Sequence, residues 1–166
     1  ICRSIWCINF NIKNDLKNNS DILILMNNFQ HQHTAHCESG VMSTMLKAQG
    51  VDFNEAMVFG LASALIFVYI PLVKVNGMPL ISYRMPPKSI IKNVAKRLKV
   101  RLKIQKFRAP QAGQEALDLA LAENKLVGLQ TSVFWLPYFP PEMRFHFNAH
   151  NLIVYGKEQN DYLISD

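Results

Sequence analysis

The chain has 166 residues, about the size of one domain, and 49% of them are hydrophobic, so it can bury a core. Only 18% of the residues are charged, which excludes an intrinsically disordered chain. The net charge is +6, but aromatic residues are not interleaved with the positive charges as a base-stacking surface requires, so no nucleic-acid partner is expected.

Residues 1–25 differ in composition from the rest of the chain, because they are rich in Asn, Ile and Lys and show little periodicity. We expect an extension or loosely attached arm there, followed by one domain over residues 26–166, with Met26 as a candidate native start. Three cysteines are too few for a disulfide framework. A free thiol is typical of a reducing compartment, so we expect a cytoplasmic protein.

Helical periodicity predicts a helix over residues 38–49, ended by Gly50. Capping-box spacing at Asp52 and Glu55 predicts a short second helix. The longest apolar run, residues 56–73, is interrupted by Gly60, Ser63 and Pro71. We interpret this run as buried core and expect no membrane segment.

Positive charge is concentrated between Lys88 and Arg108. The pattern predicts a helix over residues 87–99 and an alternating strand over residues 100–107, with most charges off the apolar faces. These charges are either an ordinary solvated surface or a docking face for an acidic partner. The candidate partner-binding residues are Lys96, Arg97 and Lys99.

The last third of the chain is predicted to hold a helix over residues 111–124 and a strand over residues 127–136. A hairpin follows, with strands at residues 148–156 and 162–166. Helices therefore come first and strands cluster late, which favours an α+β fold with N-terminal helices packed on a C-terminal antiparallel sheet.

Cys37 is the first residue of chemical interest, because it lies at the start of the first predicted helix. Unpaired N–H groups at a helix start lower the pKa of a thiol and can bind the oxyanion that forms when a thiolate attacks a carbonyl. The alternative is a buried, unreactive cysteine.

His150 lies on the predicted hairpin, where Gly156 is expected opposite Tyr162. Leu152 then pairs with Asp166, which lies diagonal to His150 on the same face. A carboxylate there can fix the imidazole tautomer so that the other ring nitrogen faces a thiol. A single β-bulge would reverse this arrangement and leave a core histidine and a solvated carboxylate. The candidate catalytic residues are Cys37, His150 and Asp166.

Several nearby residues are candidates for supporting roles. Either Gln32 or His31, five or six positions before Cys37, is placed to donate to the oxyanion. His36 and Asn148 are further supporting candidates, the latter on the predicted face of His150. The cluster of His31, His33, His36 and Cys37 has zinc-ligand residue types but matches no standard spacing, so we expect no metal, and no cofactor is expected because no phosphate-binding loop is present.

Several segments together resemble the N-terminal domain of the butirosin-biosynthesis protein H family: FQH at 29–31, HCESG at 36–40, EAMVFG at 55–60, LPYFPP at 136–141 and HFNAH at 146–150. The resemblance covers about residues 26–166. It implies a papain-like cysteine protease fold related to the peptidases that trim double-glycine leader peptides. It also implies Cys37 as nucleophile, His150 as base and Asp166 as the third member of a triad.

In the founding member of that family, an aminoacyl group moves from an acyl-carrier protein to an aminoglycoside amine. Members usually continue into a second domain, so this chain is expected to be truncated. The resemblance therefore implies cysteine-dependent acyl transfer from a thioester or amide donor to a small amine, in secondary-metabolite biosynthesis. The alternatives are a cysteine peptidase or amidase with the same triad, and a non-catalytic or zinc-binding module.

Overall fold

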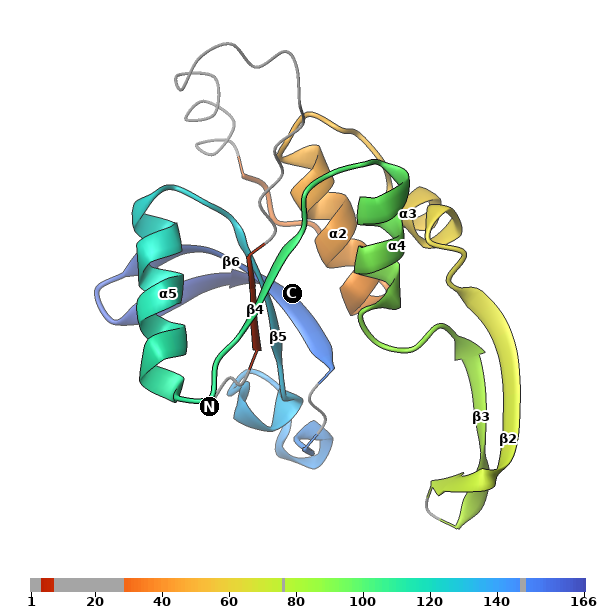
Figure 1. Cartoon of the computed structure of the whole chain (residues 1–166). Helices are drawn as coiled ribbons and strands as arrows, with labels where there is room; N and C mark the ends of the chain where they lie inside the picture. Colours follow the sequence, from red (N-terminus) through yellow and green to blue (C-terminus); the bar gives the residue numbers. More distant parts are fainter. Residues whose placement is uncertain (1–3, 8–28, 76, 147–148) are drawn as a thin grey trace.

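The computed structural model describes residues 4–7, 29–75, 77–146 and 149–166 (Figure 1). A five-stranded antiparallel sheet with the strand order β4-β1-β5-β6-β7 forms its centre. Its strands are β1 (Ser4–Cys7), β4 (Lys103–Lys106), β5 (Val127–Thr131), β6 (His150–Glu158) and β7 (Asp161–Ser165). With helices on this sheet the fold is α+β, as the sequence predicts.

Helices cover both faces of the sheet. On one face α2 (Cys37–Lys47) contacts β6, and α3 (Glu55–Leu61) and α4 (Ser89–Arg97) pack against α2 (Figure 1). On the other face lies α5 (Pro110–Ala122). Strand β6 is buried between the layers, because Ile153 packs with the α2 side and its neighbours Leu152 and Val154 pack with α5.

The apolar stripes expected for the helices are buried as predicted. Helix α2 buries Val41, Met42, Met45 and Leu46, and α4 buries Ile90, Ile91, Val94 and Ala95. The short helix α3 does form, but its cap differs from the prediction. The side chain of Asn54, rather than that of Asp52, accepts a hydrogen bond from the Met57 amide at 2.8 Å. Glu55 does not take part in a capping box, and its carboxylate accepts from the backbone amides of Ala35 and His36.

The expected order of helices before strands is wrong. Strand β1 lies between β4 and β5, so part of the segment 1–25 pairs inside the sheet. Two further strands, β2 (Leu65–Val75) and β3 (Met78–Arg84), follow α3 and form a separate two-stranded sheet, here called the β2–β3 arm (Figure 1). Strand order along the chain does not predict sheet position, because pairing joins residues far apart in sequence.

The β2–β3 arm corrects the interpretation of residues 56–73 as buried core. Phe67 is 68% exposed and Leu72 is 93% exposed, although both lie within that apolar run. Periodicity cannot reveal this exposure, since a short apolar run gives the same signal whether or not another layer covers it. Within the described ranges, no helix is both long enough and apolar enough to cross a bilayer.

The chain between β5 and β6 is less extended than predicted. Strand β5 ends at Thr131, and Ser132 caps a 3₁₀ turn, η1 (Val133–Trp135), where the sequence predicts a strand to residue 136. A second 3₁₀ turn, η2 (Pro141–Met143), follows. The hairpin strand begins only at His150, and the hairpin turn is shorter than the predicted 157–161.

Candidate active site

Cys37 is the first residue of α2. His36 caps the helix, with an extended backbone at φ −136° and ψ 118° and a ring Nδ1 atom that lies 3.3 Å from the Ser39 amide nitrogen. One turn into the helix, Gly40 packs closely against Thr34, because a Cβ there would lie 1.9 Å from the Thr34 Oγ1 atom. The thiol is therefore held at the positive end of an 11-residue helix.

His150 and Asp166 form a hydrogen-bonded pair at the ends of β6 and β7. The His150 Nε2 atom lies 2.8 Å and 2.7 Å from the two carboxylate oxygens of Asp166. The His150 and Cys37 side chains also lie close enough for each to shift the pKa of the other. Since Nε2 faces Asp166, Nδ1 is the nitrogen left for Cys37. The structure thus brings Cys37, His150 and Asp166 together in the order thiol, imidazole, carboxylate.

The strand register that joins His150 to Asp166 differs in part from the prediction. At the hairpin turn Gly156 pairs with Leu163, rather than with Tyr162 as expected. An irregularity at Tyr155 then shifts the register by one residue, so that Val154 pairs with Ile164 and Ile153 with Ser165. The shifted turn and the bulge compensate for each other, which keeps Asp166 beside His150. Tyr155 stacks on Phe29, with ring centroids 4.7 Å apart.

Electrostatics favour the charged forms of the Cys37–His150 pair. Burial raises the pKa of the Cys37 thiol, but hydrogen bonds from His150 and Asn151 and the charge of His150 lower it below the usual value. Burial lowers the pKa of His150, but Asp166 and Cys37 raise it to about 9. Each group therefore favours the charged form of the other, which is a thiolate beside an imidazolium.

Tyr138 supports Asp166, a role that the sequence analysis missed. Its hydroxyl donates to the Asp166 Oδ2 atom at 2.5 Å. Burial and the negative charge of Asp166 raise the pKa of Tyr138, so the phenol keeps the proton it donates. The next residue, Phe139, meets the His150 ring edge-on with centroids 5.5 Å apart. The LPYFPP segment carries these residues, but nothing local in it indicates contact with the hairpin.

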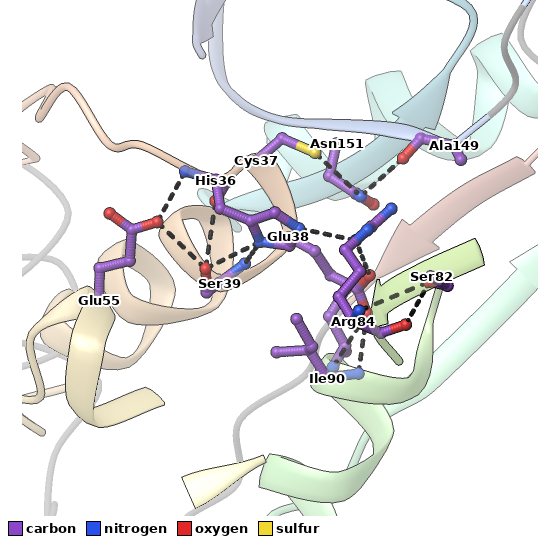
Figure 2. A network of polar contacts seen from close by, with 11 residues as sticks. His36, Cys37, Glu38, Ser39, Glu55, Ser82, Arg84, Ile90, Ala149 and Asn151 are labelled. Carbon is purple, nitrogen blue, oxygen red and sulfur yellow. Dashed lines mark hydrogen bonds and ion pairs between the residues drawn. The ribbon is translucent and has the colours of Figure 1, made fainter. Parts of the chain in front are cut away.

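Asn151 is a second residue that the sequence analysis missed. It is buried next to His150 in β6, but its side chain lies on the α2 side of the sheet. Its Nδ2 atom donates to the Cys37 sulfur at 3.7 Å and to the Ala149 carbonyl at 3.0 Å (Figure 2). Because an amide N–H donor favours a thiolate over a thiol, this contact contributes to the lowered pKa of Cys37.

Glu38 anchors the nucleophile helix to α4. Its carboxylate is buried, and its Oε1 atom accepts from the backbone amides of Ile90 at 3.0 Å and Ile91 at 3.3 Å (Figure 2). Burial raises the pKa of this carboxyl group. The guanidinium of Arg84, at the end of β3, lies 3.8 Å from the other oxygen. The acidic residue beside Cys37 therefore caps a neighbouring helix and does not contact the thiol.

The predicted supporting residues have different positions. Gln32 lines a hollow of about 10 Å³ beside Cys37, which is room for about one water molecule. The His31 Nδ1 atom lies 2.7 Å from the Ser165 hydroxyl, next to Asp166. His36 caps α2 and points toward Arg84. Asn148 lies outside the described residues.

The candidate partner-binding residues are exposed. Lys96 and Arg97 lie in the last turn of α4, and Lys99 follows the helix. Arg97 also donates to the Leu61 carbonyl and so holds α4 to the end of α3. No group of three or more potential metal ligands gathers within the part of the chain that the structure describes.

A protein-family model described as "Butirosin biosynthesis protein H, N-terminal" matches residues 36–166. No curated protein and no solved structure gives a match. The matched range begins one residue before Cys37 and ends at Asp166, so it includes the helix start, the β6–β7 hairpin and all three of the clustered side chains.

Proposed function

Because the chain belongs to the family of butirosin biosynthesis protein H N-terminal domains, we propose that it is a cysteine-dependent acyltransferase of secondary-metabolite biosynthesis with a papain-like fold. The observation that carries this proposal is the proximity of Cys37 to the hydrogen-bonded pair of His150 and Asp166, with the thiol at the start of α2. This geometry suits a nucleophile, its base and the group that orients the base.

In the proposed first step, the Cys37 sulfur attacks the carbonyl carbon of a thioester or amide. The oxyanion that forms lies near the N–H groups at the start of α2. As the intermediate collapses, the bond to the donor breaks and His150 protonates the leaving thiolate or amine. The product is an acyl group on the Cys37 sulfur and a neutral imidazole.

In the proposed second step, an amine attacks the acyl-cysteine carbonyl and gives its proton to His150. The bond to the Cys37 sulfur then breaks, which releases the amide and restores the thiolate and the imidazolium. Water in place of the amine gives hydrolysis, so a peptidase or amidase uses the same residues. Asp166 orients the imidazole throughout and stabilises its positive charge.

An acyl-carrier protein is the proposed donor, and a small amine is the proposed acceptor. Carrier proteins are acidic, and the exposed cations at the end of α4 offer a complementary surface. These cations are Lys96, Arg97 and Lys99.

The pH dependence of Cys37 alkylation tests the activated pair. With iodoacetamide, we expect Cys37 of the native chain to titrate well below the free-thiol value of about 8.5. In His150→Ala the pKa of Cys37 should return toward that value, because the imidazolium charge and its hydrogen bond are lost. Mass spectrometry of the labelled peptide separates Cys37 from Cys2 and Cys7. His146→Ala, which removes an exposed imidazole stacked on Phe134, is the matched control.

Incubation with a pantetheine thioester then tests the chemistry. We expect an acyl adduct on Cys37 that forms more slowly above about pH 9, where His150 loses the proton that it gives to the leaving group. An added amine should then remove this adduct. Alkylation at an ordinary pKa in both the native chain and His150→Ala would contradict the proposal. An activated thiol whose adduct is removed equally fast without amine would indicate a hydrolase.

A further inference from the structure

The ring of His36, the residue before Cys37, is held by groups from three other parts of the fold. The Arg84 Nη1 atom lies 2.6 Å from the His36 Nε2 atom (Figure 2). A guanidinium has only donors, so Nε2 must accept this hydrogen bond and carries no proton. In the neutral ring the proton is therefore on Nδ1, which lies 2.9 Å from the Ser39 hydroxyl. The Ser39 amide nitrogen lies farther from Nδ1, at 3.3 Å, and cannot donate to it while Nδ1 carries the proton.

The hydroxyl of Ser39 continues the series. It accepts from His36 Nδ1 and can donate to the Glu55 Oε1 atom, which lies 3.1 Å away. The donor direction is consistent from end to end, running from Arg84 through His36 and Ser39 to the Glu55 carboxylate. His36 and Ser39 each accept one hydrogen bond and donate one. A change at Arg84 therefore alters the hydrogen bond that Ser39 makes to Glu55.

Glu55 connects the series to the backbone that presents the nucleophile. Its Oε2 atom accepts from the backbone amide of Ala35 at 2.9 Å. Its Oε1 atom accepts from the backbone amide of His36 at 2.7 Å (Figure 2). These are the backbone amides of the two residues immediately before Cys37. The position of the thiol is thus tied to α3 through Glu55 and to the β2–β3 arm through Arg84.

The charged groups around His36 favour its neutral ring. Burial and the positive charge of Arg84 lower the pKa of His36, while Glu55 opposes this effect. Glu38, 3.8 Å from Arg84, is the other charged group beside the guanidinium. Phe59 meets the ring edge-on with centroids 5.7 Å apart and carries no charge. A second proton on His36 would lie on Nε2 and face the Arg84 donor, which would break the contact.

We propose that Arg84 is a positioning residue for Cys37, which holds His36 as the Nδ1–H tautomer and thereby fixes the turn at the start of α2. Arg84 contacts neither the thiol nor the reacting carbonyl, so it acts through His36. The structural part of this inference stands by itself, and only its catalytic consequence rests on the proposed function.

The tautomer can be measured directly in the native chain. In long-range ¹H–¹⁵N spectra of histidine-labelled protein at pH 7.5, we expect His36 to show a protonated Nδ1 and an unprotonated Nε2. His36→Gln identifies the signal. In Arg84→Met the pKa of His36 should rise, because a positive charge beside the ring is removed. A protonated Nε2 in the native chain, or an unchanged pKa of His36 in Arg84→Met, would overturn the inference.

The rate of Cys37 alkylation at pH 7 tests the consequence for the nucleophile. We expect Arg84→Met to slow it on the order of tenfold, since small displacements of a reacting group have large effects on rate. Arg84→Lys should recover part of the rate, because an ammonium group also donates to Nε2. Arg108→Met, which removes an exposed arginine elsewhere, is the control and should react like the native chain.

Equal rates in Arg84→Met and the native chain would show that Arg84 does not position the thiol. This failure is distinct from failure of the proposed function, in which the native thiol itself shows an ordinary pKa while the His36 tautomer remains as described.

Discussion

At the scale of single residues, Gly40 shows how closely α2 is packed against the segment that leads into it. A Cβ at Gly40 would lie 1.9 Å from Thr34 Oγ1 and 2.5 Å from Thr34 Cβ. The second distance matters more, because rotation of the Thr34 side chain cannot relieve a clash with its own Cβ. Thr34 also lines the hollow beside Cys37, so a displaced Thr34 would change the surroundings of the thiol.

We therefore expect Gly40→Ala to lower the free energy of unfolding by about 1–3 kcal/mol, the usual cost of overpacking. Urea denaturation measures this change. Gly60→Ala is a matched control, because it is also a helical glycine but has no atom within 4 Å of the added methyl group. That variant should be neutral or more stable by up to about 1 kcal/mol. Similar losses in the two variants would show that Gly40 is not tightly packed.

At the scale of secondary-structure elements, the β2–β3 arm stands apart from the rest of the fold. Its strands pair only with each other in the described residues, and it exposes apolar side chains on one face, including Phe67 and Tyr83, whose ring centroids lie 5.6 Å apart. Its base is nevertheless joined to the site, since Arg84 is the last residue of β3. The arm thus contributes little to the core but supplies one residue to the start of α2.

Substitutions in the arm should reflect this difference. Leu72 is 93% exposed, so its replacement by alanine should change the free energy of unfolding by less than about 0.5 kcal/mol. Leu46→Ala is the comparison, because Leu46 in α2 is fully buried. It should cost about 2–5 kcal/mol through lost contacts and a cavity. Thermal or urea denaturation of both variants checks the prediction, and a large loss in Leu72→Ala would show that another surface covers the arm.

At the scale of the whole molecule, the charge of the chain bears on its proposed donor. The net charge is +6, and part of the positive charge lies at the end of α4. Such a distribution accelerates encounters with an acidic protein. This acceleration weakens as the ionic strength rises. Lys96 and Lys99 are exposed, while Arg97 also bonds the Leu61 carbonyl, so a test of charge should leave Arg97 unchanged.

We expect Lys96→Glu with Lys99→Glu to reduce the association rate with an acidic acyl-carrier protein by about tenfold at low salt. The difference should shrink as salt is added, because surface charges are screened. Stopped-flow binding measures both effects. A control pair, Lys47→Glu with Lys74→Glu, makes the same change in net charge elsewhere on the surface. Equal losses in the two pairs, or no loss in the first, would argue against docking at the end of α4.

The helices and the position of Cys37 at a helix start follow from local sequence patterns. Periodicity, caps and glycines act over a few neighbouring positions, so α2, α4 and α5 and their buried stripes could be predicted from local patterns. The candidate residues Cys37, His150 and Asp166 could also be named from local patterns, although their proximity could not be established in this way.

How these parts meet depends on contacts between segments that are far apart in the chain. The approach of Asp166 to His150 depends on a register shift at Tyr155, which no local pattern predicts. The exposure of the β2–β3 arm depends on which surfaces cover it. The contacts of Tyr138, Asn151 and Arg84 with the site join residues from distant parts of the chain. Register, burial and long-range hydrogen bonds are properties of pairs of segments, so one segment's sequence does not contain them.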